Sequence, residues 1–327
     1  MKKLFNIFVV SFALVFSSSV FANKIGVVYD SGGKFDKSFN ELAFKTAERV
    51  KNELGWEMVE FESSNDAQIE QGMRKIADRG ATMIVGMGFA QADAVAAVSA
   101  DYPDIKFVAV DVCWLDDPNN NIYQACYKEH EGSFLVGMMA AMASKTGTIG
   151  FVGGMDIPLI RKFQGGYEQG AQYVNPDIEV LANMTGTTNE AWNNPTKGAE
   201  LTKTQIDGGA DVVYQAAGGT GIGVLQAAAD AGIMGIGVDA NQNWMHPGNM
   251  LTSMLKRLDL TIFAQAEAIA AGTFEPSGQF LSLGLAEGGV GYATEDGMVT
   301  DEMVAAADAA AADIASGAIV VADWSQE

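Results

Sequence analysis

Three apolar segments of this 327-residue chain each run directly into an aspartate. They are residues 24–29, 106–110 and 234–238, which are followed by Asp30, Asp111 and Asp239. Apolar runs of this length are typical of buried strands in a parallel sheet, whose ligands bind outside the carboxyl ends of the strands. We therefore expect three carboxylates at sheet edges, although an Asp in such a place also serves as a turn former or a helix N-cap.

Strand-like and helix-like segments alternate from residue 24 onward, which predicts mostly parallel sheets. Expected strands are 24–29, 58–61, 82–85, 106–110, 121–127, 148–154, 178–181, 210–214, 234–238, 251–254, 278–283 and 318–322. Expected helices are 38–53, 67–77, 90–99, 131–144, 157–173, 195–207, 222–231, 259–271 and 300–315. The length suggests about two domains of roughly 150 residues each.

The alternation of strands and helices restarts near residue 146. The additional strands expected at 251–254 and 278–283 exceed what two lobes in simple tandem would need. We therefore expect the chain to return to its first lobe. The predicted division is 23–128 plus about 254–285 for the N-terminal lobe, and 129–253 plus about 286–327 for the C-terminal lobe.

The first 22 residues have the pattern of a secretory signal peptide. Lys2 and Lys3 precede an apolar run from Leu4 to Phe16, and three serines follow it. The apolar run is too short for a membrane span, so we expect cleavage; the alternative is an uncleaved anchor. Because the first cysteine is Cys113, no cysteine is present to carry a lipid at the cleavage point. We expect a soluble protein, periplasmic in a bacterium with two membranes.

The charge balance disfavours a nucleic-acid partner. The formal net charge is −21, with only 20 Lys and Arg residues against 41 Asp and Glu. Binding to phosphates would need clustered cations, which this chain lacks. The acidity fits a role in keeping an exported protein soluble.

The two cysteines, Cys113 and Cys126, lie close together in the sequence. In an oxidising compartment we expect them to form a disulfide that steadies the loop after Asp111. The alternative is a pair of free buried thiols, since spacing alone does not establish the geometry that a disulfide requires.

Motifs of catalysis and of cofactor binding are missing from the sequence. Neither His130 nor His246 has a Cys, His or Glu at metal-ligand spacing, and no nucleophile elbow, Walker loop or zinc-protease motif occurs. The glycine-rich stretch 218–223 fails the dinucleotide fingerprint. It lies between a strand and a helix, where it is either a ligand-binding turn or only a tight connection. We expect a non-enzymatic protein with no cofactor and no metal.

Several aromatic residues are candidates for stacking on a flat ring. They are Phe35, Phe39, Trp114, Tyr214 and Trp244. Ionised carboxylates only accept hydrogen bonds, which suits the vicinal hydroxyls of a sugar. Acidic acceptors together with aromatic faces predict a site for a nucleoside, without cations for a phosphate.

A set of motifs resembles the basic membrane protein family of ABC-transporter substrate-binding proteins, which includes the purine nucleoside receptor lipoproteins. The motifs are Asp36-Lys37-Ser38-Phe39-Asn40, Glu131 to Gly137, Ser144 to Gly154, Gly209 to Tyr214, Ala217 to Gly221, Ile236 to Asp239 and Leu251 to Lys256. They occur in the family's order over residues 24 to about 260. Each motif is weak alone, and the combination is specific.

The resemblance implies a type I periplasmic-binding-protein fold, in which two Rossmann-like lobes joined by a hinge close over a purine nucleoside. It implies that Asp30, Asp111, Asp239 and Lys256 bind the ribose and neighbouring polar groups. It also implies that Phe39 and Tyr214 sandwich the base, that Asn40 reads a base edge and that Gly219 offers backbone. The implied partners are a membrane permease and its ATPase, with the receptor itself a monomer.

Two departures from the family pattern concern specificity and anchoring. Tyr214 stands where the family usually has Phe, and the lipid-bearing cysteine is absent. The leading hypothesis is a periplasmic receptor that delivers a nucleoside, of the purine class, to an ABC importer. The alternatives are a secreted nucleoside hydrolase and a ligand-sensing partner of a membrane receptor.

Overall fold

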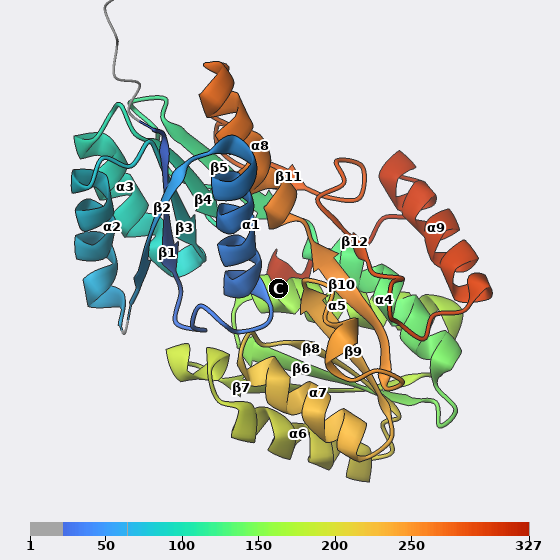
Figure 1. The fold of residues 1–327 in the computed structure, drawn as a ribbon. Coiled ribbons are helices and arrows are strands. Elements are labelled where there is room, and N and C mark those ends of the chain that lie inside the picture. The colour runs from blue at the N-terminus through green and yellow to red at the C-terminus, as the bar shows by residue number, and fades with distance from the viewer. Residues whose placement is uncertain (1–21, 64, 327) are drawn as a thin grey trace, which may run out of the picture.

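Two six-stranded sheets form the centres of two α/β lobes in the computed structural model, which describes residues 22–63 and 65–326 (Figure 1). The predicted signal peptide, residues 1–22, lies outside the described residues except for Ala22. The expected fold class, two lobes built on mostly parallel sheets, is confirmed. Among the described residues, no helix combines the length and the apolar character needed to cross a membrane.

The first sheet has the strand order β11-β5-β4-β3-β1-β2, and all its pairs are parallel. Its strands are β1 (Lys24–Tyr29), β2 (Glu57–Glu62), β3 (Met83–Met87), β4 (Lys106–Val110), β5 (Ile122–Tyr127) and β11 (Ser282–Leu283). Its helices are α1 (Phe39–Leu54), α2 (Ile69–Asp78), α3 (Ala92–Asp101) and α8 (Leu258–Ala271), with short 3₁₀ turns η1 (Asp66–Gln68) and η2 (Phe89–Gln91). Helices α1 and α8 cover one face of this sheet, and α2 and α3 cover the other.

The second sheet has the order β12-β10-β9-β8-β6-β7, in which only β12 is antiparallel to its neighbour. Its strands are β6 (Thr148–Met155), β7 (Glu179–Gly186), β8 (Val212–Ala216), β9 (Met234–Asp239), β10 (Met250–Lys256) and β12 (Val290–Tyr292). Its helices are α4 (Glu129–Ala143), α5 (Pro158–Val174), α6 (Pro195–Asp207), α7 (Thr220–Asp230) and α9 (Asp301–Ser316). The 3₁₀ turns here are η3 (Asn189–Trp192), η4 (Asn243–Met245) and η5 (Trp324–Gln326).

The chain passes between the two lobes three times, between β5 and α4, between β10 and α8, and between β11 and β12. The second sheet retains the chain through Lys256, beyond the predicted boundary at residue 253. We keep the predicted division into lobes as a proposal, with the second passage placed directly after Lys256.

The small residues of α4 allow a very close approach to α5. A Cβ atom added at Gly137 or Gly170 would collide with the backbone of the facing helix, and one at Gly166 would collide with that of His130. Glycine is required at these three positions because the two helix backbones are nearly in contact. The closest helix packing at these positions therefore lies within the second lobe.

The strand predicted at 318–322 is wrong. Val320 is 84% exposed, and both backbone polar groups of Ala322 are bonded to the side chain of Gln169 on α5. A side-chain amide thus satisfies the backbone that a neighbouring strand would have satisfied. Strand β12 was not predicted, since its three residues are too few to show a periodicity.

The predicted pairing of Cys113 with Cys126 is confirmed, with the two Cα atoms 5.7 Å apart. The bond ties the loop that follows β4 to strand β5, whose Cys126 lies opposite Ser282 of β11. It thereby restrains the chain just after Asp111.

We expect the disulfide to contribute about 3 kcal/mol to the free energy of unfolding, because it closes a short loop in the unfolded chain. Urea unfolding with and without reductant should show this difference in the wild-type protein. The double variant Cys113→Ser/Cys126→Ser should unfold at the midpoint of the reduced protein and be insensitive to reductant. Equal midpoints for the oxidised and reduced wild-type protein would contradict the expectation.

Candidate functional site

The residues at the carboxyl ends of six strands enclose a cavity between the lobes. Its empty space is about 530 Å³, part of it open to solvent. The first lobe contributes Asp30, Asp36, Phe39, Gly88, Phe89 and Asp111; the second contributes Leu159, Ile160, Phe163, Trp192, Ala216, Ala217, Gly218, Val238, Asp239 and Lys256. This is the place at which open α/β sheets bind their ligands.

Asp30 is held at the end of β1 by the beginning of α1. Its Oδ1 accepts hydrogen bonds from the Gly32 amide (2.8 Å) and from Asn40 Nδ2 (2.6 Å). Asn40 Oδ1 in turn accepts from the Asp30 amide at 3.1 Å. Within the part of the chain that the structure describes, Asp30 Oδ2 has no hydrogen-bond partner and remains for a ligand.

Asn40 is fully engaged within the protein. Its second amide hydrogen goes to Asp36 Oδ2 at 3.1 Å, and Asp36 also accepts from the backbone amides of Ser38, Asn40 and Glu41. Asn40 does not line the cavity. The structure therefore gives it the task of orienting Asp30 and Asp36. No role was predicted for Asp36, although an Asp side chain just before a helix often accepts hydrogen bonds from backbone amides at the helix start.

Asp111 and Asp239 share an unusual backbone conformation, with φ values of 62° and 63°. Asp tolerates this left-handed region better than most residues, and such conformations are concentrated at functional sites. Asp239 Oδ2 accepts a hydrogen bond from Ser38 Oγ at 2.6 Å. Two strand ends of similar sequence thus share a backbone conformation as well.

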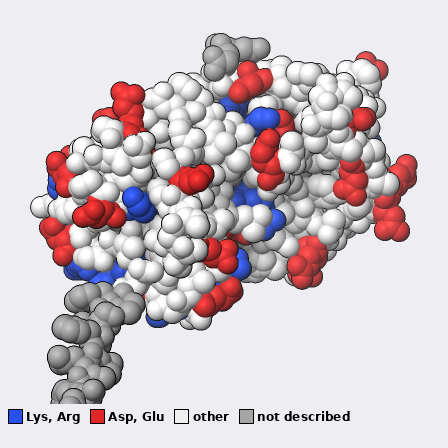
Figure 2. Space-filling view, turned by 90° about the horizontal axis from the view of Figure 1, so that it is seen from above, with Lys and Arg blue, Asp and Glu red and all other residues white. Residues whose placement is uncertain are grey.

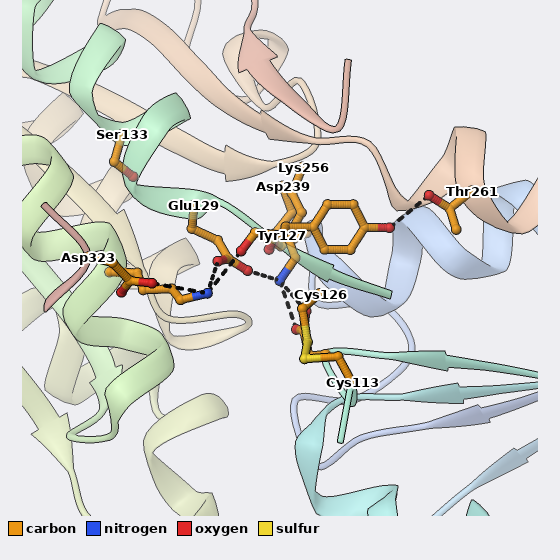
Figure 3. A network of polar contacts seen from close by, with 12 residues as sticks. Cys113, Cys126, Tyr127, Glu129, Ser133, Asp239, Lys256, Thr261 and Asp323 are labelled. Atoms are coloured by element: carbon orange, nitrogen blue, oxygen red, sulfur yellow. Dashed lines mark hydrogen bonds and ion pairs between the residues drawn. A yellow bond between two sulfur atoms is a disulfide. The ribbon is translucent and has the colours of Figure 1, made fainter. Parts of the chain in front are cut away.

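Lys256 is buried at the back of the cavity between two carboxylates (Figure 3). Its Nζ lies 2.7 and 2.8 Å from the two oxygens of Asp111 and 2.9 Å from Glu129 Oε1. Asp111 belongs to the first lobe, whereas Lys256 and Glu129 lie beside the passages between the lobes. Sequence reasoning missed Glu129 because the predicted helix began at residue 131, whereas α4 begins at Glu129 itself.

Burial and charge compete in setting the protonation of this cluster. Burial raises the pKa of Asp30 and of Asp239, and it raises the pKa of Asp111 to about 6 against the opposing effect of Lys256. Burial alone would lower the pKa of Lys256, but Asp111, Glu129 and Asp239 together raise it well above its usual value. The ammonium therefore stays charged although it is 1% exposed.

Four aromatic side chains line the cavity: Phe39, Phe89, Phe163 and Trp192. Only Phe39 was predicted. Trp192 ends η3, a short turn that the hydrophobic pattern did not reveal. Phe163 lies on α5, where its spacing fits an ordinary core residue equally well. A Cβ at Gly154 would collide with the Trp192 ring, so that glycine makes room for the indole.

Tyr214 is placed behind the cavity. It is fully buried, packs against Phe151 and Tyr167 with ring centroids 5.5 and 5.1 Å away, and its hydroxyl lies 3.2 Å from Ser133 Oγ. Gly219 also lies off the cavity wall, whereas its neighbour Gly218 lines it. The remaining aromatic candidates, Phe35, Trp114 and Trp244, are about half exposed or more and do not line the cavity.

The two lobes are in direct contact around the cavity. Ser38 Oγ donates to Asp239 Oδ2 and lies 3.1 Å from the Val238 carbonyl, and Gln242 Nε2 donates to the Lys37 carbonyl at 3.0 Å. Within residues 22–63 and 65–326, no group of three or more His, Cys, Asp or Glu side chains is arranged to hold a metal ion. The arrangement can enclose a small polar ligand and present it with carboxylates and aromatic rings.

Replacing Lys256 by Met should lower the free energy of unfolding by about 3–5 kcal/mol, because Asp111 would remain buried without a cation and Glu129 would keep only Lys162. Both carboxyl pKa values would then rise. A raised pKa in the folded protein gives stability at low pH that is lost as the pH rises. The variant's loss of unfolding free energy, relative to wild type, should therefore be smaller at pH 5 than at pH 8. Urea unfolding at both pH values tests this, with the exposed Lys203→Met as control; a deficit that does not change with pH would contradict it.

Comparison with known proteins agrees with this architecture. The sequence model of the Bmp family, described as ABC transporter substrate-binding protein PnrA-like, matches residues 22–324. Basic membrane protein A2 of Borrelia garinii is 33% identical over 304 residues, which cover 91% of this chain and 88% of that protein. The ABC transporter nucleoside-binding protein BmpA of Lactococcus lactis is 31% identical over 320 residues, with coverages of 91% and 88%.

A solved structure of similar fold is an ABC transporter system solute-binding protein from Aeropyrum pernix K1. It superposes with a TM-score of 0.82 at 27% identity, over 92% of this chain and 93% of that one. The resemblance inferred from the sequence motifs is thus confirmed. The chain belongs to the Bmp family of PnrA-like ABC transporter substrate-binding proteins.

Proposed function

We propose that this protein binds a nucleoside, of the purine class, between its two lobes and delivers it to a membrane permease and its ATPase. The observation that carries the proposal is a cavity that combines strand-end carboxylates with aromatic rings and whose lining cation is already paired. The Lactococcus lactis relative is named a nucleoside-binding protein, which supports the ligand class.

The carboxylates suit the hydroxyls of a ribose. Asp30 Oδ2 and Asp239 Oδ1 receive no hydrogen bond from the residues that the structure describes, while the partner oxygen of each is fixed by the protein. Each bond from a hydroxyl to an ionised carboxylate contributes about 1.5–3 kcal/mol net. Because one oxygen of each group is already oriented, little ordering of the site is needed when the sugar binds.

The aromatic side chains suit the faces of a base. Phe39 comes from the first lobe, and Phe163 and Trp192 come from the second. A flat ring held between residues of different lobes can be covered on both sides only when the lobes meet. Stacking contributes roughly 1–3 kcal/mol per base by analogy with nucleic-acid binding.

A phosphate group fits this site poorly. Lys256 is the one basic residue in the cavity lining formed by the described residues, and both of its short contacts are carboxylates. A phosphate would meet Asp30, Asp111 and Asp239 without a free cation to compensate them. We therefore propose nucleosides, and not nucleotides, as the ligand class.

The proposed location is the periplasm or its equivalent outside the cytoplasm. The Cys113–Cys126 disulfide fits an oxidising compartment. Figure 2 shows acidic side chains spread over one face of the molecule and basic ones in smaller groups, in keeping with the net charge of −21. Such a surface keeps a freely diffusing monomer soluble.

Asp239→Ala should weaken nucleoside binding at least tenfold, about 1.4 kcal/mol or more, because a hydroxyl acceptor is lost. Ser38→Ala removes the bond between the lobes but keeps the carboxylate, so its effect should be smaller. Isothermal titration with adenosine, guanosine and inosine measures both, with the exposed Asp104→Ala as control. Equal losses for the Asp239 and Ser38 variants would show that Asp239 acts only through the contact between the lobes.

Mass spectrometry of the small molecules released on denaturing the purified protein should find a nucleoside, since closed lobes dissociate slowly from their ligand. Titration with adenosine 5′-monophosphate should show far weaker binding than titration with adenosine. Prolonged incubation with nucleosides should yield no free base; its accumulation would favour a hydrolase. A protein that is empty and binds none of the three nucleosides would overturn the proposed function.

A further inference from the structure

Lys256 is one member of a longer series of charges, three of them buried and two partly exposed, that no sequence motif indicated. We call Asp111, Lys256, Glu129, Lys162 and Asp323 the ion-pair series. Glu129 Oε1 lies 2.9 Å from Lys256 Nζ, and its Oε2 lies 3.3 Å from Lys162 Nζ. Figure 3 shows Glu129 between the Lys256 and Asp323 sides of the series. Charges alternate in sign along the whole series.

Glu129 lies behind Lys256 as seen from the cavity. Its carboxylate is 0% exposed, and it is absent from the cavity lining. Burial would raise its pKa, but Lys256 and Lys162 hold the pKa of Glu129 below its usual value. Its place at the first position of α4 also favours the negative charge. A carboxylate that is ionised, buried and out of the ligand's reach can act on the ligand only through Lys256.

The ammonium of Lys256 has three N–H donors to distribute. Both oxygens of Asp111 lie within 2.8 Å of it, and Glu129 Oε1 competes for it at 2.9 Å. Without the charge of Glu129, the ammonium would be drawn entirely towards the carboxylates that line the cavity. Asp111 would then have fewer lone pairs left for a ligand hydroxyl.

Lys162 fixes the second oxygen of Glu129 and is itself fixed on two sides. Its Nζ donates to the Tyr127 carbonyl at 3.0 Å and lies 4.0 Å from Asp323 Oδ2. Next to Asp323, Trp324 packs at Gly165 of α5, where an added Cβ would collide with its ring. The C-terminal segment, docked on α5, therefore helps to place a lysine that acts on the ligand site only through Glu129.

We propose that Glu129 and Lys162 are positioning residues for ligand binding: Glu129, held by Lys162, shares the Lys256 ammonium with Asp111 and so leaves lone pairs of Asp111 that can accept ligand hydroxyls. This inference rests on the proposed nucleoside-binding function. It adds two residues that do not touch the ligand, and it links the C-terminal segment to the site.

The test is titration calorimetry of the full chain and its variants with whichever of adenosine, guanosine and inosine binds the wild type most tightly. Glu129→Gln should weaken binding about tenfold, and Lys162→Met about threefold. Lys162→Arg, which keeps the charge, should restore near wild-type affinity. The double variant Glu129→Gln/Lys162→Met should bind no more weakly than Glu129→Gln alone, because Lys162 acts through Glu129.

Asp211→Asn is the matched control. Asp211 accepts hydrogen bonds from Ser144 Oγ, the Lys145 amide and the Thr146 amide, at the opposite end of β8 from the cavity. Its variant should lose stability in urea unfolding but keep the wild-type affinity. Loss of affinity in Asp211→Asn equal to that in Glu129→Gln would overturn the positioning role, since general destabilisation would then explain both.

The remaining outcomes separate this inference from the proposed function. A wild type that binds a nucleoside while Glu129→Gln binds it equally well overturns the positioning role alone. A wild type that binds none of the three overturns both. If Glu129→Gln does not fold, the comparison of Lys162→Met with Lys162→Arg decides, and equal affinities for these two overturn the inference.

Discussion

The ammonium of Lys256 is the interaction on which the rest of the site depends. It is the cation through which the carboxylates at the back of the cavity can stay buried and ionised, since Asp111 and Glu129 both lie within 2.9 Å of it. Removing charges from water is costly, and close pairing with good geometry compensates that cost. Lys256 is also the last residue of β10, directly before the chain passes to α8, so the charge lies where the two lobes are joined.

Near this cation, both sheets place aspartates at the ends of their strands. Strands β1, β4 and β9 each end in an aspartate at the cavity, and two of these aspartates share a left-handed backbone. A carboxylate on a strand end has a direction set by the sheet, and a hydrogen bond to one oxygen sets which oxygen remains for the ligand. Ser38 and Asn40 make those bonds from the beginning of α1, so one helix start orients groups in both lobes.

Much of the framework could be predicted from the sequence because buried parallel strands are continuous apolar runs, and the aspartates that follow them are visible as interruptions. Those runs correctly indicated strands that end at Asp30, Asp111 and Asp239. The ligand contacts implied for Asn40 and Tyr214 stay predictions: neither residue lines the cavity, and their polar groups bond within the protein. Trp192 and Glu129 were missed because their positions follow from a short turn and from a helix start that begins earlier than the apolar pattern. The false strand at 318–322 arose because a side chain, Gln169, replaced a strand as partner.

Because β11 returns to the first sheet, that sheet can be completed only after most of the chain has been synthesised. Strand β5 pairs with β4 on one side and with β11 on the other. In the sequence, β11 comes after every strand of the second sheet except β12. During synthesis, the edge of β5 therefore lacks its second strand until residue 283 has been added, and uncovered edges invite pairing with other chains. The partner of Cys126, Cys113, precedes β5 in the chain, so the disulfide can form on that edge beforehand and tie it to the β4 loop. The covalent bond thus restrains, early in the chain's history, the strand whose second neighbour arrives late in the sequence.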